Sequence, residues 1–403
     1  MFELYNKNIK VAEISEDDCA LKIVEPDFIP FELRGQRSAL NFLNNRSHDA
    51  NRIFSAAIEA MLGVKSIDKM IDKTALASLN DTFWLKKDSA DLSWEDVNLY
   101  DEQNNFDMRL FRAALMGLTE EDYVSYFRDE SFFHVVTPEL TTGGSYAKAW
   151  YRDKEDGLCL LKRGKKQYSN REVVSEYLAF KVAEQLCKES AVYHLKRHDG
   201  NIYCASEIFT DENHSFIPFV NYMYASGRYQ KSTESVIDYV KTVVSKFDDE
   251  NKVNEMLMLD ALTCNKDRHF GNLGFLYDPN IMEITSFSPV FDFNQSLGFD
   301  VPDYLVREIG TYTPQVNFKI GGDVREIIKN CSTRSLLDKV ETCELNIPAS
   351  VNFDFWTEER NDMVKRMFDY QKERILTNGK FCALEREFNS DSDTPISYCD
   401  LER

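Results

Sequence analysis

The feature that most constrains this chain is the segment at residues 265–272, which has the sequence Asn-Lys-Asp-Arg-His-Phe-Gly-Asn. It places Asp267 and Asn272 five residues apart, directly after an apolar run at residues 253–264 that predicts a helix. Phosphoryl transfer needs a carboxylate that accepts the proton of the attacking hydroxyl, and a carboxamide oxygen can bind Mg²⁺ without adding a second base. The spacing is therefore typical of a phosphotransferase catalytic loop, although a bare match also occurs in ordinary turns.

A second acidic residue, Asp292, follows twenty residues downstream in the sequence Ser-Pro-Val-Phe-Asp-Phe-Asn at residues 288–294. It comes after a short apolar stretch, as a metal-binding aspartate at the end of a strand would. A kinase needs such a carboxylate to hold Mg²⁺ across the β- and γ-phosphates. The alternative interpretation is that Asp292 only begins a turn with Asn294 and Gln295.

Two segments before these sites are suited to nucleotide phosphates. Residues 157–164 predict a short buried strand between glycines, with Lys162 near its end, although a strand-end lysine is more often simply solvated. Upstream, Gly143 and Gly144 allow backbone N–H groups to approach a phosphate, and Lys148 adds positive charge. Because neither the Walker pattern nor the full glycine pattern of ordinary protein kinases is present, the glycine pair alone is also consistent with an ordinary turn.

A helix is predicted to follow this strand. Ser169 and Glu172 have the spacing of a capping box, which opens a helix that runs to about Cys187. On that helix Glu176 is placed to pair with Lys162, as a helix glutamate pairs with a strand lysine in ATP-binding kinases. Glu172 is the competing candidate, although capping gives it a separate role.

Taken in order, these segments resemble the HipA-like serine/threonine kinases, including the CtkA-type members, and the Asp-Arg-His-x-x-Asn pattern is also similar to that of phosphatidylinositol kinases. The resemblance covers about residues 138 to 300, and the first 135 residues show no match. It rests on Gly144–Lys148, Leu161-Lys162, Ser175-Glu176-Tyr177, Asn265–Asn272 and Phe291-Asp292. One departure is Phe293-Asn294, where ordinary protein kinases carry Phe-Gly.

The resemblance implies an α/β (α+β), two-lobed, protein-kinase-like fold of HipA type. We expect an N-terminal accessory region at residues 1–135, a small β-rich N-lobe at 136–212, a mainly helical C-lobe at 213–387 and a flexible tail at 388–403. It also implies an ATP- and Mg²⁺-dependent kinase that phosphorylates protein serine or threonine, with a small antitoxin-like protein as a partner.

Site roles follow from the same resemblance. Asp267 is the expected catalytic base, and Asn272 and Asp292 are the expected Mg²⁺ ligands. Lys162 is the expected nucleotide-phosphate lysine, oriented by Glu176.

The resemblance also assigns roles outside this group. The loop with Gly143, Gly144, Ser145 and Lys148 would cover the triphosphate. Family members can be silenced by autophosphorylation in or just before this loop, which points to Thr141, Thr142 or Ser145. Residues 203–209 look like the hinge strand, with adenine held around Glu207 to Phe209. Independently of the resemblance, the loop between Asp267 and Asn272 carries Arg268 and His269, which either hold its shape or meet phosphate oxygens.

Composition narrows the class of partner. The 48 basic and 68 acidic residues leave a formal net charge of −20, which argues against direct nucleic-acid binding. The nine cysteines lack C-x-x-C spacing, as in reduced intracellular proteins, and no apolar run is long enough to span a bilayer. A cytoplasmic protein is expected.

Three alternatives remain open from the sequence. The first is a lipid kinase, because phosphatidylinositol kinases share the catalytic-loop pattern. The second is a silent kinase fold that binds nucleotide and signals through a partner, and the third is a metal-dependent hydrolase that uses the same carboxylates.

Outside the site, the pattern predicts strands at residues 2–5 and 10–14 and helices near 38–44 and 52–62. Trp84 and Trp94 are interpreted as core or edge anchors, and residues 93–96 resemble a helix start. Residues 356–376 predict one amphipathic helix that stops at Asn378-Gly379.

Overall fold

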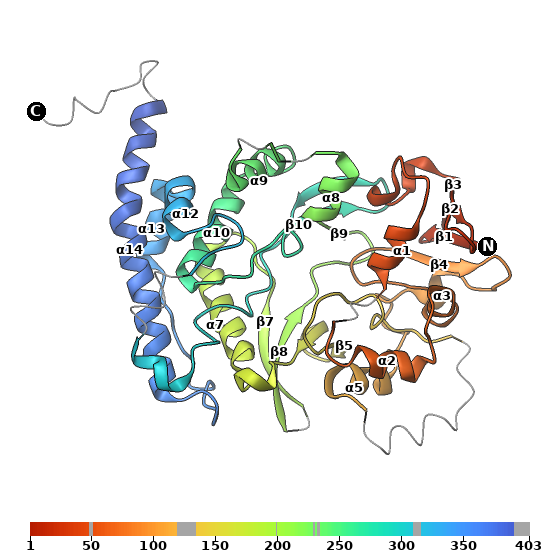
Figure 1. Ribbon diagram of the computed structural model, residues 1–403, viewed down its shortest axis with the longest axis horizontal. Coiled ribbons are helices and arrows are strands. Elements are labelled where there is room, and N and C mark those ends of the chain that lie inside the picture. The colour runs from red at the N-terminus through yellow and green to blue at the C-terminus, as the bar shows by residue number, and fades with distance from the viewer. Residues whose placement is uncertain are drawn as a thin grey trace, which may run out of the picture. The chain divides into compact units, whose positions relative to one another are not determined.

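The computed structural model describes residues 1–47, 51–118, 134–198, 200–228, 230–231, 234–308 and 316–390. The chain divides into two compact units, each assembled from three separate segments. Unit 1 comprises residues 1–173, 191–229 and 270–289, and unit 2 comprises residues 174–190, 230–269 and 290–403. Figure 1 follows the chain through both units. Helix α7 (Arg171–Leu186) begins in unit 1 and continues in unit 2.

Unit 1 contains the three sheets that the described residues form. Its strands are β1 (Phe2–Asn6), β2 (Ile9–Ile14), β3 (Leu21–Ile23), β4 (Phe83–Lys87), β5 (Lys148–Asp153), β6 (Gly157–Lys162), β7 (Tyr193–His198), β8 (Asn201–Glu207), β9 (Ser215–Pro218), β10 (Gly274–Asp278) and β11 (Glu283–Phe287). Its helices are η1 (Pro26–Phe28), η2 (Phe31–Leu33), α1 (Leu40–Arg46), α2 (Ser55–Leu62), α3 (Ile67–Thr74), α4 (Trp94–Val97), α5 (Met108–Met116), η3 (Lys166–Tyr168) and α8 (Phe219–Ser226).

The first sheet has the antiparallel order β3-β2-β1-β4. Phe2, Leu4 and Asn6 are buried while the residues between them are half-buried, because successive side chains of a strand point to opposite faces. The expected strands at residues 2–5 and 10–14 are confirmed. Trp84 and Trp94 lie in one buried cluster with Leu158 of β6, so both tryptophans are core anchors.

The turn after β1 is tied to the turn between β10 and β11. Asn6 Nδ2 donates to the carbonyl of Pro279 at 2.8 Å, and Lys7 Nζ donates to Asn280 Oδ1 at 2.7 Å. These partners lie 273 residues apart in the sequence. The N-terminal strands of unit 1 are therefore bonded directly to one of its last segments.

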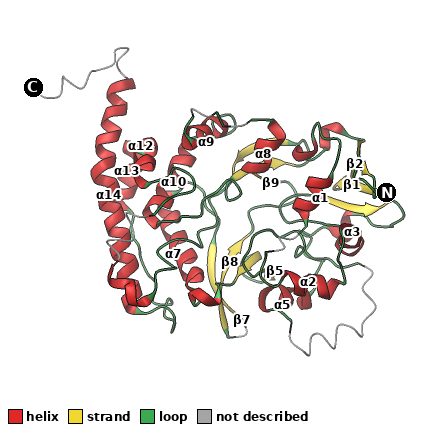
Figure 2. Cartoon of the chain, viewed as in Figure 1, coloured by secondary structure: helices red, strands yellow, loops and turns green. Residues whose placement is uncertain are grey.

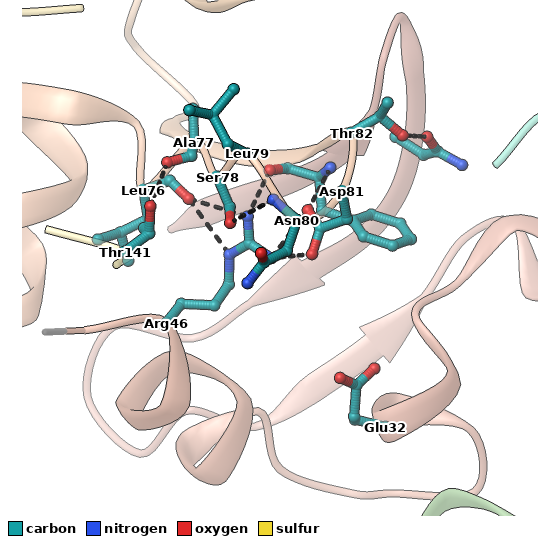
Figure 3. A network of polar contacts seen from close by, with 12 residues as sticks. Glu32, Arg46, Leu76, Ala77, Ser78, Leu79, Asn80, Asp81, Thr82 and Thr141 are labelled. Atoms are coloured by element: carbon teal, nitrogen blue, oxygen red, sulfur yellow. Dashed lines mark hydrogen bonds and ion pairs between the residues drawn. The ribbon is translucent and has the colours of Figure 1, made fainter. Parts of the chain in front are cut away.

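Arg46 organises the loop between α3 and β4 (Figure 3). Its guanidinium lies 2.8 Å from Asp81 Oδ2 and also donates to the carbonyls of Leu76 and Phe83. The Arg46 side chain is almost fully buried, so these acceptors replace the water that it loses on folding. The network fixes the irregular backbone that leads into β4.

The other two sheets of unit 1 are also antiparallel. One has the order β5-β6-β8-β7 and the other the order β11-β10-β9. The strand expected at residues 157–164 is β6, and it ends at Lys162 as predicted. The expected helix start at residues 93–96 is confirmed as a capping box of Ser93 and Asp96.

Unit 2 is built from helices in its described part (Figure 2). They are α9 (Val236–Val244), α10 (Asn251–Thr263), η4 (Asp303–Glu308), α12 (Val324–Cys331), α13 (Arg334–Thr342) and α14 (Glu358–Ser390), together with most of α7. Helix α10 contacts both α12 and α14. The predicted helix at residues 253–264 is confirmed as α10, which is buried along nearly its whole length.

Two local predictions are wrong. Helix α14 does not stop at Asn378-Gly379 but continues to Ser390. Gly379 serves close packing on α13 instead, because a Cβ there would be 2.7 Å from Leu337 Cδ2. The predicted capping box at Ser169 is also absent. The N–H of Ser169 bonds to the Lys166 carbonyl within the η3 turn, so it is not the donor that Glu172 would cap.

Residues 388–390 belong to α14, and residues 391–403 of the expected tail lie outside the described residues. Among the helices of the described part, none combines the length and the apolar character that crossing a membrane requires.

Candidate active site

The glycine loop of unit 1 is closed by one of its own lysines. Lys148, at the start of β5, donates from Nζ to the carbonyl of Gly143 at 2.7 Å. Gly144 has a φ of +89°, which favours glycine, and a Cβ there would lie 2.7 Å from the same ammonium. The loop thus holds a buried cation beside an exposed glycine pair.

A second lysine faces the first across the sheet. In the β5–β6 pairing Lys148 lies directly opposite Lys162, and each residue is 9% exposed. Directly opposed residues of an antiparallel pair project from the same face, and like charges there repel. The charge of Lys148 also interacts with the buried carboxylate of Glu139. The ammonium of Lys162 also lies 5.9 Å from the ring centroid of Tyr193.

The turn after β6 is tightly packed. Glu172 Oε1 accepts a hydrogen bond from the backbone N–H of Lys165 at 3.1 Å, and burial raises the pKa of this carboxyl. Gly164 lies beside it: a Cβ there would be 2.5 Å from the Asn170 Cα. Glu172 thus supports this turn, while Glu176 is a buried residue of α7 in unit 2.

The three hydroxyl residues of the glycine loop differ in surroundings. Thr141 is buried and donates to the carbonyl of Ala77 at 2.7 Å (Figure 3). Thr142 donates to the carbonyl of Pro138 at 2.7 Å and accepts a hydrogen bond from the Trp150 indole at 3.0 Å. Ser145 lies beyond the glycine pair and is half-buried.

The expected hinge coincides with the end of β8, which stops at Glu207. The backbone N–H of Glu207 bonds to the Val192 carbonyl and that of Ile208 to the Leu158 carbonyl. The Glu207 carboxylate lies 2.6 Å from His194 Nε2. Phe209, beyond the strand, meets Phe216 edge-on with ring centroids 5.6 Å apart.

The catalytic-loop candidate is supported by a buried ion pair inside unit 2. Asp260 of α10 accepts hydrogen bonds from Arg268 Nε at 2.9 Å and Nη2 at 3.1 Å, and from Asn265 Nδ2 at 2.8 Å. Asp260 and Arg268 are each 1% exposed. Burial raises the pKa of the Asp260 carboxyl, and the charge and hydrogen bonds of Arg268 oppose this shift.

This ion pair also binds the segment that carries the second acidic candidate. Arg268 donates from Nη1 to the carbonyl of Phe291, and Asn265 Nδ2 lies 3.4 Å from the carbonyl of Asp292. Asp292 has a φ of +63°, an uncommon backbone conformation for a residue other than glycine. Such strained positions cluster at functional sites, where the surrounding structure holds them.

The carboxylate of Asp267 receives two side-chain donors. Gln295 Nε2 lies 2.6 Å from its Oδ2, and Lys319 forms an ion pair with its Oδ1. The Asp267 side chain is 19% exposed, so solvent and small groups can reach it. The pKa of His269 is lowered, mainly by partial desolvation of the ring, while Asp267 and Asp292 oppose the shift.

Asn272 lies in unit 1, on the segment that approaches β10, and is 8% exposed. The backbone on either side is anchored to α8, since the N–H of Val220 bonds to the Phe270 carbonyl and that of Phe219 to the Leu273 carbonyl. Within unit 2 the structure brings Asp267, His269 and Asp292 together. Within unit 1 it brings together Gly143, Gly144, Lys148 and Lys162.

Sequence reasoning missed three residues of this neighbourhood. Asp260 carried a signal, since an acidic residue inside an otherwise apolar helix requires a buried partner. Gln295 lies only three residues beyond Asp292, but its sequence context indicates a turn residue and gives no sign of a contact with Asp267. Lys319 is 52 residues from Asp267 and carried no local signal.

Neither the family models nor the curated proteins include a match to this chain. Among solved structures, the chain is similar to HipA of Shewanella oneidensis MR-1, from a toxin–antitoxin complex with HipB and operator DNA. The identity is 12% and the TM-score 0.52, over 98% of this chain and all of that one. A second similarity is to the Helicobacter pylori proinflammatory kinase CtkA, at 19% identity and a TM-score of 0.47, over 60% of this chain and 95% of that one. The similarity to HipA shows that the chain has the same two-lobed, kinase-like fold.

Proposed function

We propose that the protein is an ATP- and Mg²⁺-dependent phosphotransferase that phosphorylates serine or threonine of a protein substrate. The observation that carries the proposal is the loop around Asp267. Its backbone is fixed by the buried Asp260–Arg268 pair, while the Asp267 carboxylate stays accessible and receives polar side chains. A rigid loop that presents one carboxylate suits the base that accepts a hydroxyl proton.

The opposed lysines of unit 1 support the same proposal from the nucleotide side. Lys148 and Lys162 are cross-strand neighbours beside a glycine loop, an arrangement that favours a polyphosphate. In this proposal Lys162 holds the α- and β-phosphates with Glu176 as its orienting partner, and the loop of Gly143 and Gly144 covers them. His269 contacts the phosphates or supports the loop.

The donor chemistry of Asn272 and Asp292 fits Mg²⁺, which prefers a small number of hard oxygen ligands. These two residues would hold the ion, with Asp292 kept in its strained conformation by the Arg268 and Asn265 contacts. When bound, Mg²⁺ neutralises charge on the phosphates. Asp267 then accepts the proton of the acceptor hydroxyl.

Adenine binding at the end of β8 also remains a proposal. The N–H groups of Glu207 and Ile208 already bond to the carbonyls of Val192 and Leu158, so Phe209 is the better candidate for a contact with the base. Among the autophosphorylation candidates, Ser145 is favoured over Thr141 and Thr142, because both threonine hydroxyls donate to backbone carbonyls.

The cellular context stays a prediction. The HipA structure similar to this chain was solved with HipB and operator DNA. We propose a small antitoxin-like protein as a partner, no direct binding of nucleic acid and a cytoplasmic location.

The decisive experiment measures Mg²⁺-dependent transfer from γ-labelled ATP to a cell lysate. Wild type is compared with Asp267→Asn and with Glu341→Gln, which removes an exposed carboxylate of unit 2 that pairs with Lys380. Transfer that is lost in Asp267→Asn and kept in Glu341→Gln supports the proposal. Equal transfer by wild type and Asp267→Asn would overturn it, and nucleotide binding without transfer would favour a silent module.

A further inference from the structure

The segment at residues 316–322 is a tight turn built around one lysine. Phe318 and Gly322 exchange both backbone hydrogen bonds, and Gly321 has a φ of +97°. A Cβ on Gly321 would lie 2.8 Å from Ile327 Cγ1, so this glycine lets the turn pack closely on α12. Lys319 occupies the bend between the two ends of this turn.

Burial in this turn differs sharply between neighbours. Phe318 is 3% exposed and Ile320 is 2% exposed, whereas the side chain of Lys319 is 54% exposed. The apolar neighbours fix the backbone of the turn in unit 2. The backbone of Lys319 is therefore held in place, while its exposed ammonium group can still move.

The ammonium of Lys319 pairs with Oδ1 of Asp267, and Gln295 donates to Oδ2 of the same carboxylate. An ion pair with one partner this exposed contributes little to folding stability, so the turn is held by its buried apolar residues and not by this pair. Such a pair can also open readily when a stronger anion arrives. A phosphate is such an anion, since it carries more charge than a carboxylate.

From this geometry we propose that Lys319 binds the γ-phosphoryl group during transfer. The inference rests on the proposed function, in which Asp267 accepts the proton of the acceptor hydroxyl. The bond from the acceptor oxygen to the γ-phosphorus forms, the bond to the β,γ-bridging oxygen breaks, and its electron pair leaves with ADP. The Lys319 ammonium moves from Asp267 to the equatorial oxygens and stabilises their charge, and the carboxylate is released for the proton.

The position of Lys319 supports this role on general grounds. The acceptor hydroxyl must lie within hydrogen-bond distance of the catalytic carboxylate, and the transferred phosphorus lies one bond further. A cation already paired with that carboxylate is therefore within a side-chain movement of the reacting group. A cation that reaches this place lowers the barrier because it stabilises the charge on the transferred group.

The test compares wild type with Lys319→Ala, Lys319→Arg and the control Lys380→Ala. Lys380 is a similarly exposed lysine of unit 2, 59% exposed, whose partner is Glu341. We expect Lys319→Ala to lower kcat by about 100-fold, the loss typical of one transition-state donor. Lys319→Arg should restore part of the rate because the guanidinium keeps the charge. Binding of Mg-ADP, which lacks the γ-phosphate, should not change.

The outcomes separate this inference from the proposed function. If wild type transfers phosphate and Lys319→Ala does so at the same rate, the inference on Lys319 fails alone. A faster Lys319→Ala enzyme would also overturn it, and would show that the pair holds Asp267 in an inhibited state. A parallel loss of Mg-ADP binding in Lys319→Ala would indicate a structural role instead. If wild type transfers nothing, the proposed function fails and this inference with it.

Discussion

The buried pair of Asp260 and Arg268 allows a quantitative test of how the candidate catalytic loop is held. We consider Asp260→Asn, which keeps the shape of the side chain and removes its charge. Asp260 accepts two hydrogen bonds from Arg268 and one from Asn265, and both charged residues are 1% exposed. The variant leaves a guanidinium buried without its carboxylate.

Breaking a buried ion pair by removing one partner costs about 3–5 kcal/mol. This is a large part of the total stability of a protein domain, about 5–15 kcal/mol. With a urea m-value of about 2–3 kcal/mol/M, the unfolding midpoint of unit 2 should fall by about 1–2.5 M. Burial raises the pKa of Asp260, so the charge is costly in itself, and replacing both partners should cost less than replacing one.

The assay is a double-mutant cycle of Asp260→Leu, Arg268→Leu and the double variant, measured beside Asp260→Asn. Because a chain of two units need not unfold in one step, urea unfolding should be followed by hydrogen exchange of peptides from α10. We expect the double variant to be more stable than the sum of the single changes predicts, by about 1–3 kcal/mol. Glu341→Gln, at an exposed pair, should change stability by no more than about 0.5 kcal/mol.

Two results would refute this reasoning. The first is a loss of less than about 1 kcal/mol in Asp260→Asn, which would mean that the pair is solvated or weakly coupled. The second is strict additivity in the cycle, which would mean that the two side chains act independently.

Three further predictions concern unit 1. Arg46→Met should destabilise this unit by about 3–5 kcal/mol, because the Asp81 carboxylate then loses its largely buried partner; urea unfolding followed by hydrogen exchange of β4 measures this. Gly274→Ala should open the pairing of β9 with β10, because the new Cβ would lie 2.2 Å from the Ile217 carbonyl oxygen; faster exchange confined to β9 and β10 would show it, and unchanged exchange would contradict it. Burial lowers the pKa of His134 below its ordinary 6.5, so the unfolded chain binds more protons and wild-type stability should fall as pH drops below about 6.5. His134→Gln should flatten that dependence in unfolding curves between about pH 5 and 6.5, and an identical pH dependence would exclude this histidine as its source.

Local patterns predicted the elements that carry the candidate site. The strand that ends at Lys162 and the apolar helix before Asp267 could be recognised because a short buried strand and a long apolar run have distinct lengths and flanking residues. The helix start at residues 93–96 could be recognised because the groups that cap it lie within four residues.

The remaining features depend on tertiary contacts. Gly379 resembles a helix stop but lies inside α14, where the absence of a side chain allows close packing on Leu337. Ser169 has the spacing of a cap, yet the η3 turn uses its N–H. Lys319 and Asp267 are 52 residues apart in the sequence, so no local pattern could have predicted that these two side chains form a pair.

The bonds from Asn6 and Lys7 to the turn at residues 279–280 have a consequence for biosynthesis. At about 5–20 residues per second, a ribosome needs roughly 15–55 s to add the 273 residues that separate these partners. During that interval the first strands have been made but lack their final neighbours, so chaperones have time to bind them. Asn6 gains its bond to Pro279 only after that interval, so a substitution there should act on the stability of the finished unit and not on the early nascent chain.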